Sequence, residues 1–259
     1  MSYKSPIEDF KYNLAMLNYD EVIAGIEKFK EYDSETLMSV VSEIGRLNEQ
    51  EVLDSNKIGD REGLKYVTDG AEGPEVHTPE RFKKLYDAVK SSGYVGATMP
   101  TQYGGGGAPF TTAILAGEIG IAANMAFYMG PGLSHGAMKT ILKKATEELK
   151  DKYLPNMTSG EWMGTMCLTE PQCGTDLGLI KSTAVPKDDH YELTGQKIWI
   201  SFGEHDLTEN IIHLVLARTP DAPEGIKGIS LFLVPKRLDD NSRNTIYCGG
   251  LEHKLGITS

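Results

Sequence analysis

Two short segments of the chain carry residues suited to binding a flat, polar ring. They are residues 166–176, which read MCLTEPQCGTD, and residues 195–201, which read GQKIWIS. A strand that ends at Thr169 and then turns through proline and glycine leaves backbone N–H groups and hydroxyls free at its end. Such groups can hydrogen-bond the edge of a heterocycle and a pyrophosphate, and Trp199 offers the ring a flat face. The residues alone equally allow a capped turn beside a core tryptophan.

Other groups of reactive residues lack the spacing that their chemistry needs. The tetraglycine at 104–107 has neither the Lys-Ser/Thr of a phosphate loop nor a preceding βαβ unit, which favours a mobile loop. Ser134-His135 and Ser201 are not set in a GxSxG turn, so a hydrolase is disfavoured. The six histidines include no HExxH pair, and no metal site is predicted.

The composition is that of an ordinary globular protein. Of the 259 residues, 40% are hydrophobic and 24% are charged, and the formal net charge is −11. This negative charge argues against a nucleic-acid partner. The three cysteines lack CxxC spacing and are expected to be reduced thiols. Neither a secretory signal nor a run of about 18 apolar residues is found, so we expect a cytoplasmic protein without membrane insertion.

The hydrophobic pattern predicts helices first and strands later. The clearest helix is 78–92, with Thr78 as its N-cap, and others are expected at 34–53, from Pro109 and at 146–159. A long surface loop is expected between the first two helices, at 54–77. Short β-prone runs follow at 162–168, 180–186, 190–194, 197–202, 211–218, 228–235 and 244–250. The run at 191–195 is expected to form a hairpin with 196–200.

These patterns predict an α+β chain with two domains of different class. The first is an all-α helical domain at 1–160, and the second is a mostly antiparallel, barrel-like β-domain at 161–259.

The pair of motifs, LTEPxxGTD and GQKIWIS, resembles the acyl-CoA dehydrogenase family, whose middle β-domain binds flavin. The resemblance extends over most of the chain, to MPTQYGG at 99–105, KYLP at 152–155 and GISLFLVP at 228–235. It accounts for the glycine run without a phosphate. Residues 1–32 resemble an N-terminal extension found in one large bacterial branch of the family.

The resemblance implies FAD as the cofactor and α,β-dehydrogenation of an acyl-CoA as the reaction. Met166, Leu168 and Thr169 would hold the pyrimidine edge of the flavin, and Trp199 and Ser201 would lie beside its ring. Gly174 and Thr175 would lie by the pyrophosphate or the bound thioester, which makes Thr175 a substrate-binding candidate as well. Met166 stands where many family members have an aromatic residue.

The resemblance also implies that part of the enzyme lies outside this chain. Residues 251–259 resemble a point inside the middle domain, and the family's catalytic base belongs to a C-terminal helical domain that follows it. We therefore assign no catalytic residue, and interpret Glu170 as a structural acid of the turn. The isolated chain is expected to be inactive, to bind little flavin, and to self-associate through an exposed sheet edge.

The implied partners are an acyl-CoA substrate, an electron-transfer flavoprotein or similar acceptor, and further copies of the chain in a homo-oligomer. Three alternatives remain open at this point. They are an acyl-CoA oxidase, a non-catalytic binding or scaffold protein that keeps the fold, and a flavoprotein of the alkylation-response type.

Overall fold

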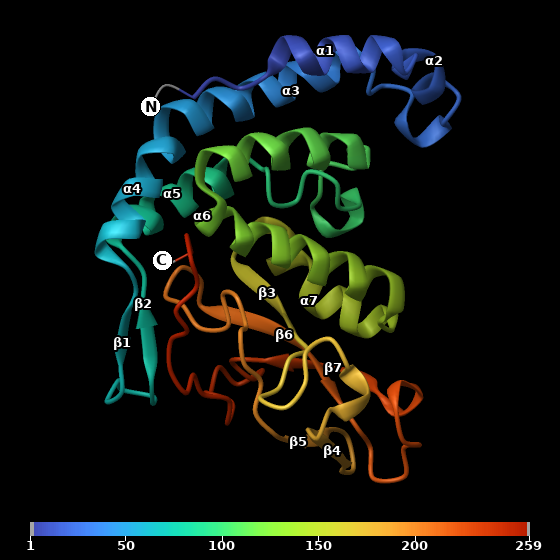
Figure 1. Ribbon diagram of the computed structural model, residues 1–259. Helices are drawn as coiled ribbons and strands as arrows, with labels where there is room; N and C mark the ends of the chain where they lie inside the picture. Colours follow the sequence, from blue (N-terminus) through green and yellow to red (C-terminus); the bar gives the residue numbers. More distant parts are fainter. Residues whose placement is uncertain (1–2, 258–259) are drawn as a thin grey trace.

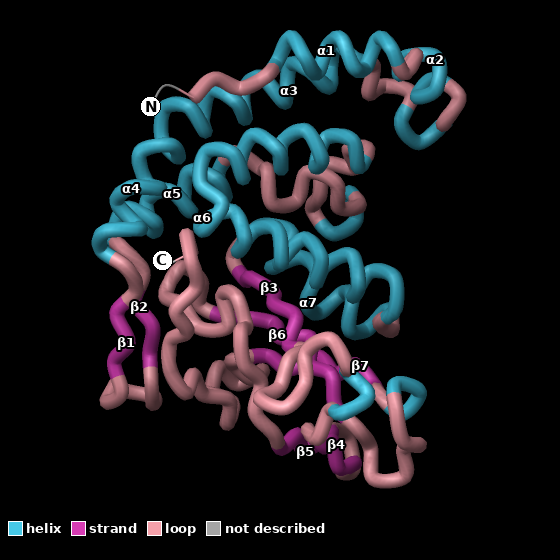
Figure 2. Tube along the Cα trace, in the orientation of Figure 1, coloured by secondary structure: helices cyan, strands magenta, loops and turns pink. Residues whose placement is uncertain are grey.

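The structure of the protein, a computed structural model, describes residues 3–257 and confirms the α+β prediction. Helices form one half of the molecule, and most strands and long loops form the other (Figures 1 and 2). The helices are α1 Ile7–Met16, α2 Tyr19–Ala24, α3 Ser34–Leu47, α4 Leu53–Glu62, α5 Glu80–Ser91, α6 Phe110–Lys144 and α7 Glu147–Ser159. The strands are β1 Lys65–Val67, β2 Glu75–His77, β3 Trp162–Cys167, β4 Thr183–Pro186, β5 Tyr191–Thr194, β6 Asn210–Ala217 and β7 Ser230–Pro235.

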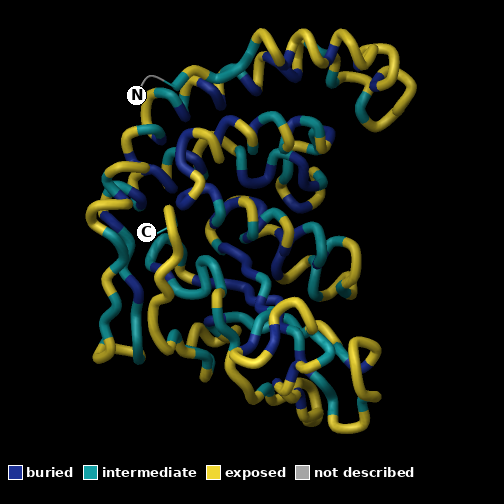
Figure 3. The backbone as a smooth tube through the Cα atoms, viewed as in Figure 1, coloured by how far each residue is buried: buried dark blue, intermediate teal, exposed yellow. Residues whose placement is uncertain are grey.

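Helices α1 and α2 form an N-terminal arm that packs along α3 (Figure 1). Phe10 and Leu14 of α1 join Leu37 and Val41 of α3 in a small apolar cluster of their own. Asp33 begins α3 by accepting a hydrogen bond from the Thr36 amide at 2.8 Å. The outer side of the arm is largely exposed (Figure 3).

The region expected to be a long loop is instead a helix and a hairpin. After α3, the chain passes through a short π-helix at Asn48–Val52, continues as α4, and then forms the antiparallel β1–β2 hairpin. Ser55 and Gly59 are buried in α4, and Ser55 Oγ accepts a hydrogen bond from Asn124 of α6 at 2.8 Å. The loop prediction at 54–77 is wrong because these small residues let two helices pack closely.

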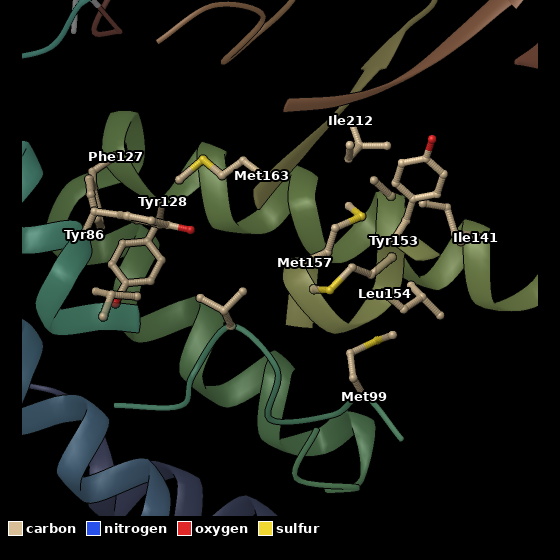
Figure 4. Packing of buried hydrophobic residues seen from close by; sticks show 14 of the residues in the cluster. Tyr86, Met99, Phe127, Tyr128, Ile141, Tyr153, Leu154, Met157, Met163 and Ile212 are labelled. Carbon is tan, nitrogen blue, oxygen red and sulfur yellow. The ribbon is translucent and has the colours of Figure 1, made fainter. Parts of the chain in front are cut away.

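Helix α5 is present where the sequence predicts it, but its start differs from the prediction. Thr78 makes no cap, because its amide and hydroxyl both donate to Asp206 Oδ1, at 2.9 and 2.8 Å. The apolar face of α5 buries Phe82 and Tyr86 in the main core. Figure 4 shows this core, where side chains of α5, α6 and α7 meet Met163 of β3.

Helix α6 is bent sharply at Asn124, whose φ of −157° and ψ of 95° are not helical. Its two halves lie against each other, so that Phe110 stacks on His135 with ring centroids 6.1 Å apart. Within residues 3–257, α6 is the helix long and apolar enough to cross a membrane, judged by length and composition alone. The helix is bent within this length, and 44% of the apolar window is buried inside the protein.

Helix α7 is framed as the sequence predicts. Thr146 caps its start by accepting from the Leu149 amide, and Gly160 ends it in the left-handed conformation, with φ of 83°.

The strands of the described residues form three open sheets that do not close into a barrel. In the largest sheet β3 pairs parallel with β6, and β6 pairs antiparallel with β7. β4 and β5 form a separate antiparallel pair. Residues 197–202 and 244–250 are not strands, and the 191–195 run pairs with β4 instead of 196–200. Those three predictions are therefore wrong.

Candidate functional site

The first half of the candidate site is the turn that follows β3. The strand lies at the edge of its sheet, packed against α6 and α7. Beyond it, Glu170 and Cys173 exchange two backbone hydrogen bonds, of 2.8 and 3.0 Å, which close the turn. The turn brings Gly174 back against Thr169, so closely that a Cβ at 174 would lie 3.3 Å from Thr169 Cγ2. The end of the strand and the glycine thus form one surface.

The second half is the irregular segment that was expected to be a strand at 197–202. The Ile198 amide donates to the Thr169 carbonyl at 2.9 Å, which joins this segment directly to the end of β3. Trp199 and Phe202 then adopt left-handed backbone conformations, with φ of 59° and 54°. Bulky residues rarely adopt such angles, and propensity gives no sign of them.

Phe202 anchors this segment to the helical half of the molecule. Its ring lies so close to Gly130 of α6 that a Cβ there would be 2.7 Å away, and it meets His205 edge-on, with centroids 5.7 Å apart. Trp199 is 45% exposed, whereas Ser201 is half-buried. The segment therefore holds a large flat side chain at the surface beside the strand end.

Glu170 lies beneath the turn, and its carboxylate is fully occupied. Oε1 accepts from Lys197 Nζ at 2.7 Å and from the Ser182 amide at 3.1 Å. Oε2 accepts from the Lys181 amide at 2.8 Å and from Gln172 Nε2 at 2.6 Å. Burial raises the pKa of this carboxyl, but these hydrogen bonds outweigh it and lower the pKa to about 2. Glu170 is therefore ionised, and both of its carboxylate oxygens are hydrogen-bonded within the turn region.

The structure brings together some of the residues singled out in the sequence more closely than others. Gly174 lies against Thr169, and Trp199 directly follows Ile198, whose amide donates to the Thr169 carbonyl next to Leu168. Met166 is half-buried and packs against the main core. Thr175 is exposed, next along the chain from Gly174, and Ser201 lies two residues beyond Trp199.

Lys197 belongs to this site, although the sequence analysis gave it no role. Its Nζ donates to the Leu168 carbonyl at 3.0 Å as well as to Glu170, and its side chain is only 11% exposed. The sequence feature that could have revealed this role is the position of Lys197 two residues before Trp199 in the second motif.

A buried polar group lies on the sheet behind the turn. Thr165 Oγ1 is 2.7 Å from His213 Nδ1, and Cys167 Sγ is 3.9 Å from the same nitrogen. Burial lowers the pKa of His213 to about 4 and raises that of Cys167, so both side chains are neutral. Among residues 3–257, no three His, Cys, Asp or Glu side chains gather as a metal site would require.

A second set of paired charged side chains, some buried and some partly exposed, lies where the strands meet the start of α5. Glu204 pairs with Lys236 and, at 2.7 Å, with Arg243. Asp206 accepts from Thr78 and pairs with Lys83 at 2.9 Å and His77 at 3.0 Å. Burial opposes ionisation of Asp206, yet the hydrogen bonds lower its pKa to about 2. These charges connect the β-rich half to the helices.

Two family models match this chain in succession. The N-terminal domain of acyl-CoA dehydrogenases matches residues 65–161, and the middle domain matches residues 165–259, which includes the whole candidate site. The chain belongs to the acyl-CoA dehydrogenase family, a family of flavoprotein oxidoreductases.

Individual relatives agree with this assignment. The chain is 40% identical over 263 aligned residues to 3-methylmercaptopropionyl-CoA dehydrogenase of Ruegeria pomeroyi, covering 99% of this chain but 44% of that protein. A chain in the structure of the electron transferring flavoprotein of Acidaminococcus fermentans superposes with a TM-score of 0.69 at 26% identity. It covers 87% of this chain and 53% of the other. The acyl-CoA dehydrogenase of Bacillus anthracis complexed with FAD gives 0.62 at 25% identity, with coverages of 80% and 31%.

Proposed function

We propose that this chain is the N-terminal and middle part of an enzyme that dehydrogenates an acyl-CoA thioester between its α and β carbons, with FAD as cofactor. The helical domain comprises 1–160 and the β-domain begins at 161. The observation that carries the proposal is the exposed side chain of Trp199, which directly follows Ile198, whose amide donates to the Thr169 carbonyl in the same turn that brings Gly174 against Thr169. The relative from Bacillus anthracis, which is complexed with FAD, shares this fold and supports the cofactor.

The residues present fit a flat ring with a polar edge. Trp199 offers an exposed aromatic side chain. Gly174 has no side chain to cover the surface beside Thr169. Met166, Leu168 and Thr169 would hold the ring edge, Gly174 and Thr175 the pyrophosphate or thioester, and Trp199 and Ser201 the side of the ring. When bound, FAD supplies the acceptor for the hydride that leaves the β carbon.

The base that removes the α-proton is proposed to lie outside this chain. Glu170 is the carboxylate nearest the site in sequence, but its four hydrogen bonds and its pKa of about 2 make it a poor proton acceptor at neutral pH. The chain spans 44% of the first relative's length, which leaves room for the base elsewhere. We therefore propose that residues 1–259 alone are inactive.

Family membership and the similarity to an electron transferring flavoprotein chain support the proposed partners. An acyl-CoA is the substrate, and an electron-transfer flavoprotein receives the electrons. The complete enzyme would act as a homo-oligomer in the cytoplasm.

The test is to read the source gene past the codon for Ser259, express its complete product, and assay it with acyl-CoA and a dye acceptor. We expect bound FAD and turnover in the complete product, and no turnover in residues 1–259. Turnover by the short chain at the same rate would contradict the placement of the base. A complete product without FAD would overturn the proposal, and stoichiometric peroxide would identify an oxidase instead.

A further inference from the structure

The Glu170–Lys197 pair joins three separate segments at one buried point. Glu170 comes from the turn after β3, Lys197 from the segment before Trp199, and the amides of Lys181 and Ser182 precede β4. The side chains of Glu170 and Lys197 are 3% and 11% exposed. Because both charges are paired and also hydrogen-bonded to neutral groups, neither is left uncompensated.

Lys197 and its neighbour together bind the carbonyls of the two residues that follow β3. Lys197 Nζ donates to Leu168 O at 3.0 Å, and the Ile198 amide donates to Thr169 O at 2.9 Å. Two adjacent residues of one segment therefore bind two adjacent residues of the other. These two hydrogen bonds fix the position of residues 197 and 198 relative to residues 168 and 169, and so fix the direction of the backbone that leads to Trp199.

Trp199 needs such an attachment. Its backbone is left-handed, a conformation that is unfavourable for a residue with a Cβ and that persists where the surroundings hold it in place. The indole is 45% exposed, so its own packing supplies only part of that constraint. The hydrogen bonds of Lys197 and Ile198 hold the chain immediately before it, and Phe202 anchors the chain after it.

We propose that Glu170 and Lys197 are a positioning pair that holds Trp199 and the carbonyls of Leu168 and Thr169 in one fixed arrangement, the arrangement that receives the flavin ring. The proposal rests on the proposed function for the identity of the ring. It does not make either residue catalytic, because the pair acts through Trp199 and the strand end.

The test uses Trp199 as its own reporter. In a Trp162→Phe background, Trp199 is the single tryptophan, since the chain has two. We expect Lys197→Met to raise acrylamide quenching of Trp199 about twofold, as a side chain now 45% exposed becomes free. Lys197→Arg should restore most of the original value, because it keeps a buried donor and the charge.

Two further variants separate positioning from stability. Lys236→Met breaks the other buried glutamate–lysine pair, with the same lysine exposure of 11%, and should destabilise the fold without changing Trp199 quenching. The double variant Glu170→Gln/Lys197→Met removes both charges and leaves no buried charge unpaired. It therefore serves as the test if the single variant fails to fold. We expect the double variant to free Trp199 as well. Unchanged quenching in the folded double variant would overturn the proposal.

The flavin part is read on the complete gene product. There, Lys197→Met should weaken FAD binding about tenfold, with Lys236→Met close to wild type. If the complete product binds no FAD but Lys197→Met still frees Trp199, the proposed function fails and the positioning role stands. If FAD binds equally to both and Trp199 is unchanged, the positioning role fails and the proposed function stands.

Discussion

Glu170 and Glu204 are two buried carboxylates of the β-rich half, and each is paired with a lysine, but they are satisfied differently. Glu204 faces two cations, Lys236 and Arg243, and so joins its loop to the segment after β7 by charge. Glu170 faces one cation and shares its remaining lone pairs among two main-chain amides and a side-chain amide. The side-chain cations that pair with Glu204 can move together with its carboxylate. The main-chain amides that donate to Glu170 instead fix the path of the backbone at Lys181 and Ser182. The comparison indicates that Glu170 shapes the candidate site and Glu204 closes the fold.

The largest effect is expected from removing either carboxylate. Glu170→Ala leaves Lys197 buried without its partner. Glu204→Ala likewise leaves Lys236 and Arg243 without theirs. Each should lower the free energy of unfolding by about 3–5 kcal/mol, measured by urea denaturation with circular dichroism. Glu192→Ala is the control, because the side chain of Glu192 is 62% exposed in its pair with Lys187 and should cost under about 1 kcal/mol. A loss as small as the control's would show that the buried pair is unimportant.

Acid should weaken the Glu170 side of the comparison. Its pKa is lowered from 4.5 to about 2 in the folded chain, so its contribution is present above the unfolded pKa and is lost as the pH falls through the folded one. The contribution is about 3 kcal/mol. We expect the free energy of unfolding to fall between about pH 5 and pH 2. Glu170→Gln should flatten that part of the profile, and an unchanged slope would contradict the assignment.

In the region of Glu204, the free energy of unfolding should begin to fall at a higher pH, because of His205. Burial, with Lys236 adding to it, lowers the pKa of His205 from 6.5 to about 3. The unfolded chain therefore takes up a proton first as the pH falls below 6.5, and folding loses about 2 kcal/mol by pH 5. His205→Asn keeps an acceptor for the Leu207 amide, which now donates to Nδ1 at 3.2 Å, and should remove this early loss. Burial also lowers the pKa of His213 and His135 to about 4. Unfolding curves at pH 7 and pH 5 should therefore show a difference that shrinks by about 2 kcal/mol in His205→Asn, and an unchanged difference would contradict the assignment.

The smallest effect is expected at Trp199 itself. Trp199→Gly and Trp199→Ala both lose the indole, but only glycine relieves the left-handed backbone at φ 59°. The glycine variant should therefore be more stable than the alanine variant by about 1 kcal/mol. Thermal unfolding of the two variants side by side measures this difference. Equal stability would mean that the backbone at 199 relaxes when the indole is removed.

The fold was largely predictable where one local signal decides it. Thr146 and Gly160 frame α7, and the apolar spacing of Phe82 and Tyr86 reveals α5. Helix α4 was missed because its small residues, Ser55 and Gly59, suit a loop equally well, and their burial against α6 is decided by distant parts of the chain.

The candidate site was predictable as two motifs but not as a shape. The turn after β3 follows from its proline and glycine, whereas Trp199 has a conformation that tryptophan does not favour in isolation. The partners of Glu170 lie 2, 11, 12 and 27 residues away in sequence, and no local pattern links them. The geometry of the site is set by these non-local hydrogen bonds.

The four bonds of Glu170 also determine how this region opens. The amides of Lys181 and Ser182 lie outside any strand, yet both are held by the carboxylate, so their protons should exchange with solvent slowly. They can be released only when the carboxylate moves, which also breaks its ion pair with Lys197. The strand end, the start of β4 and the Trp199 segment should therefore open as one cooperative unit, so that the region is either fully formed or fully lost.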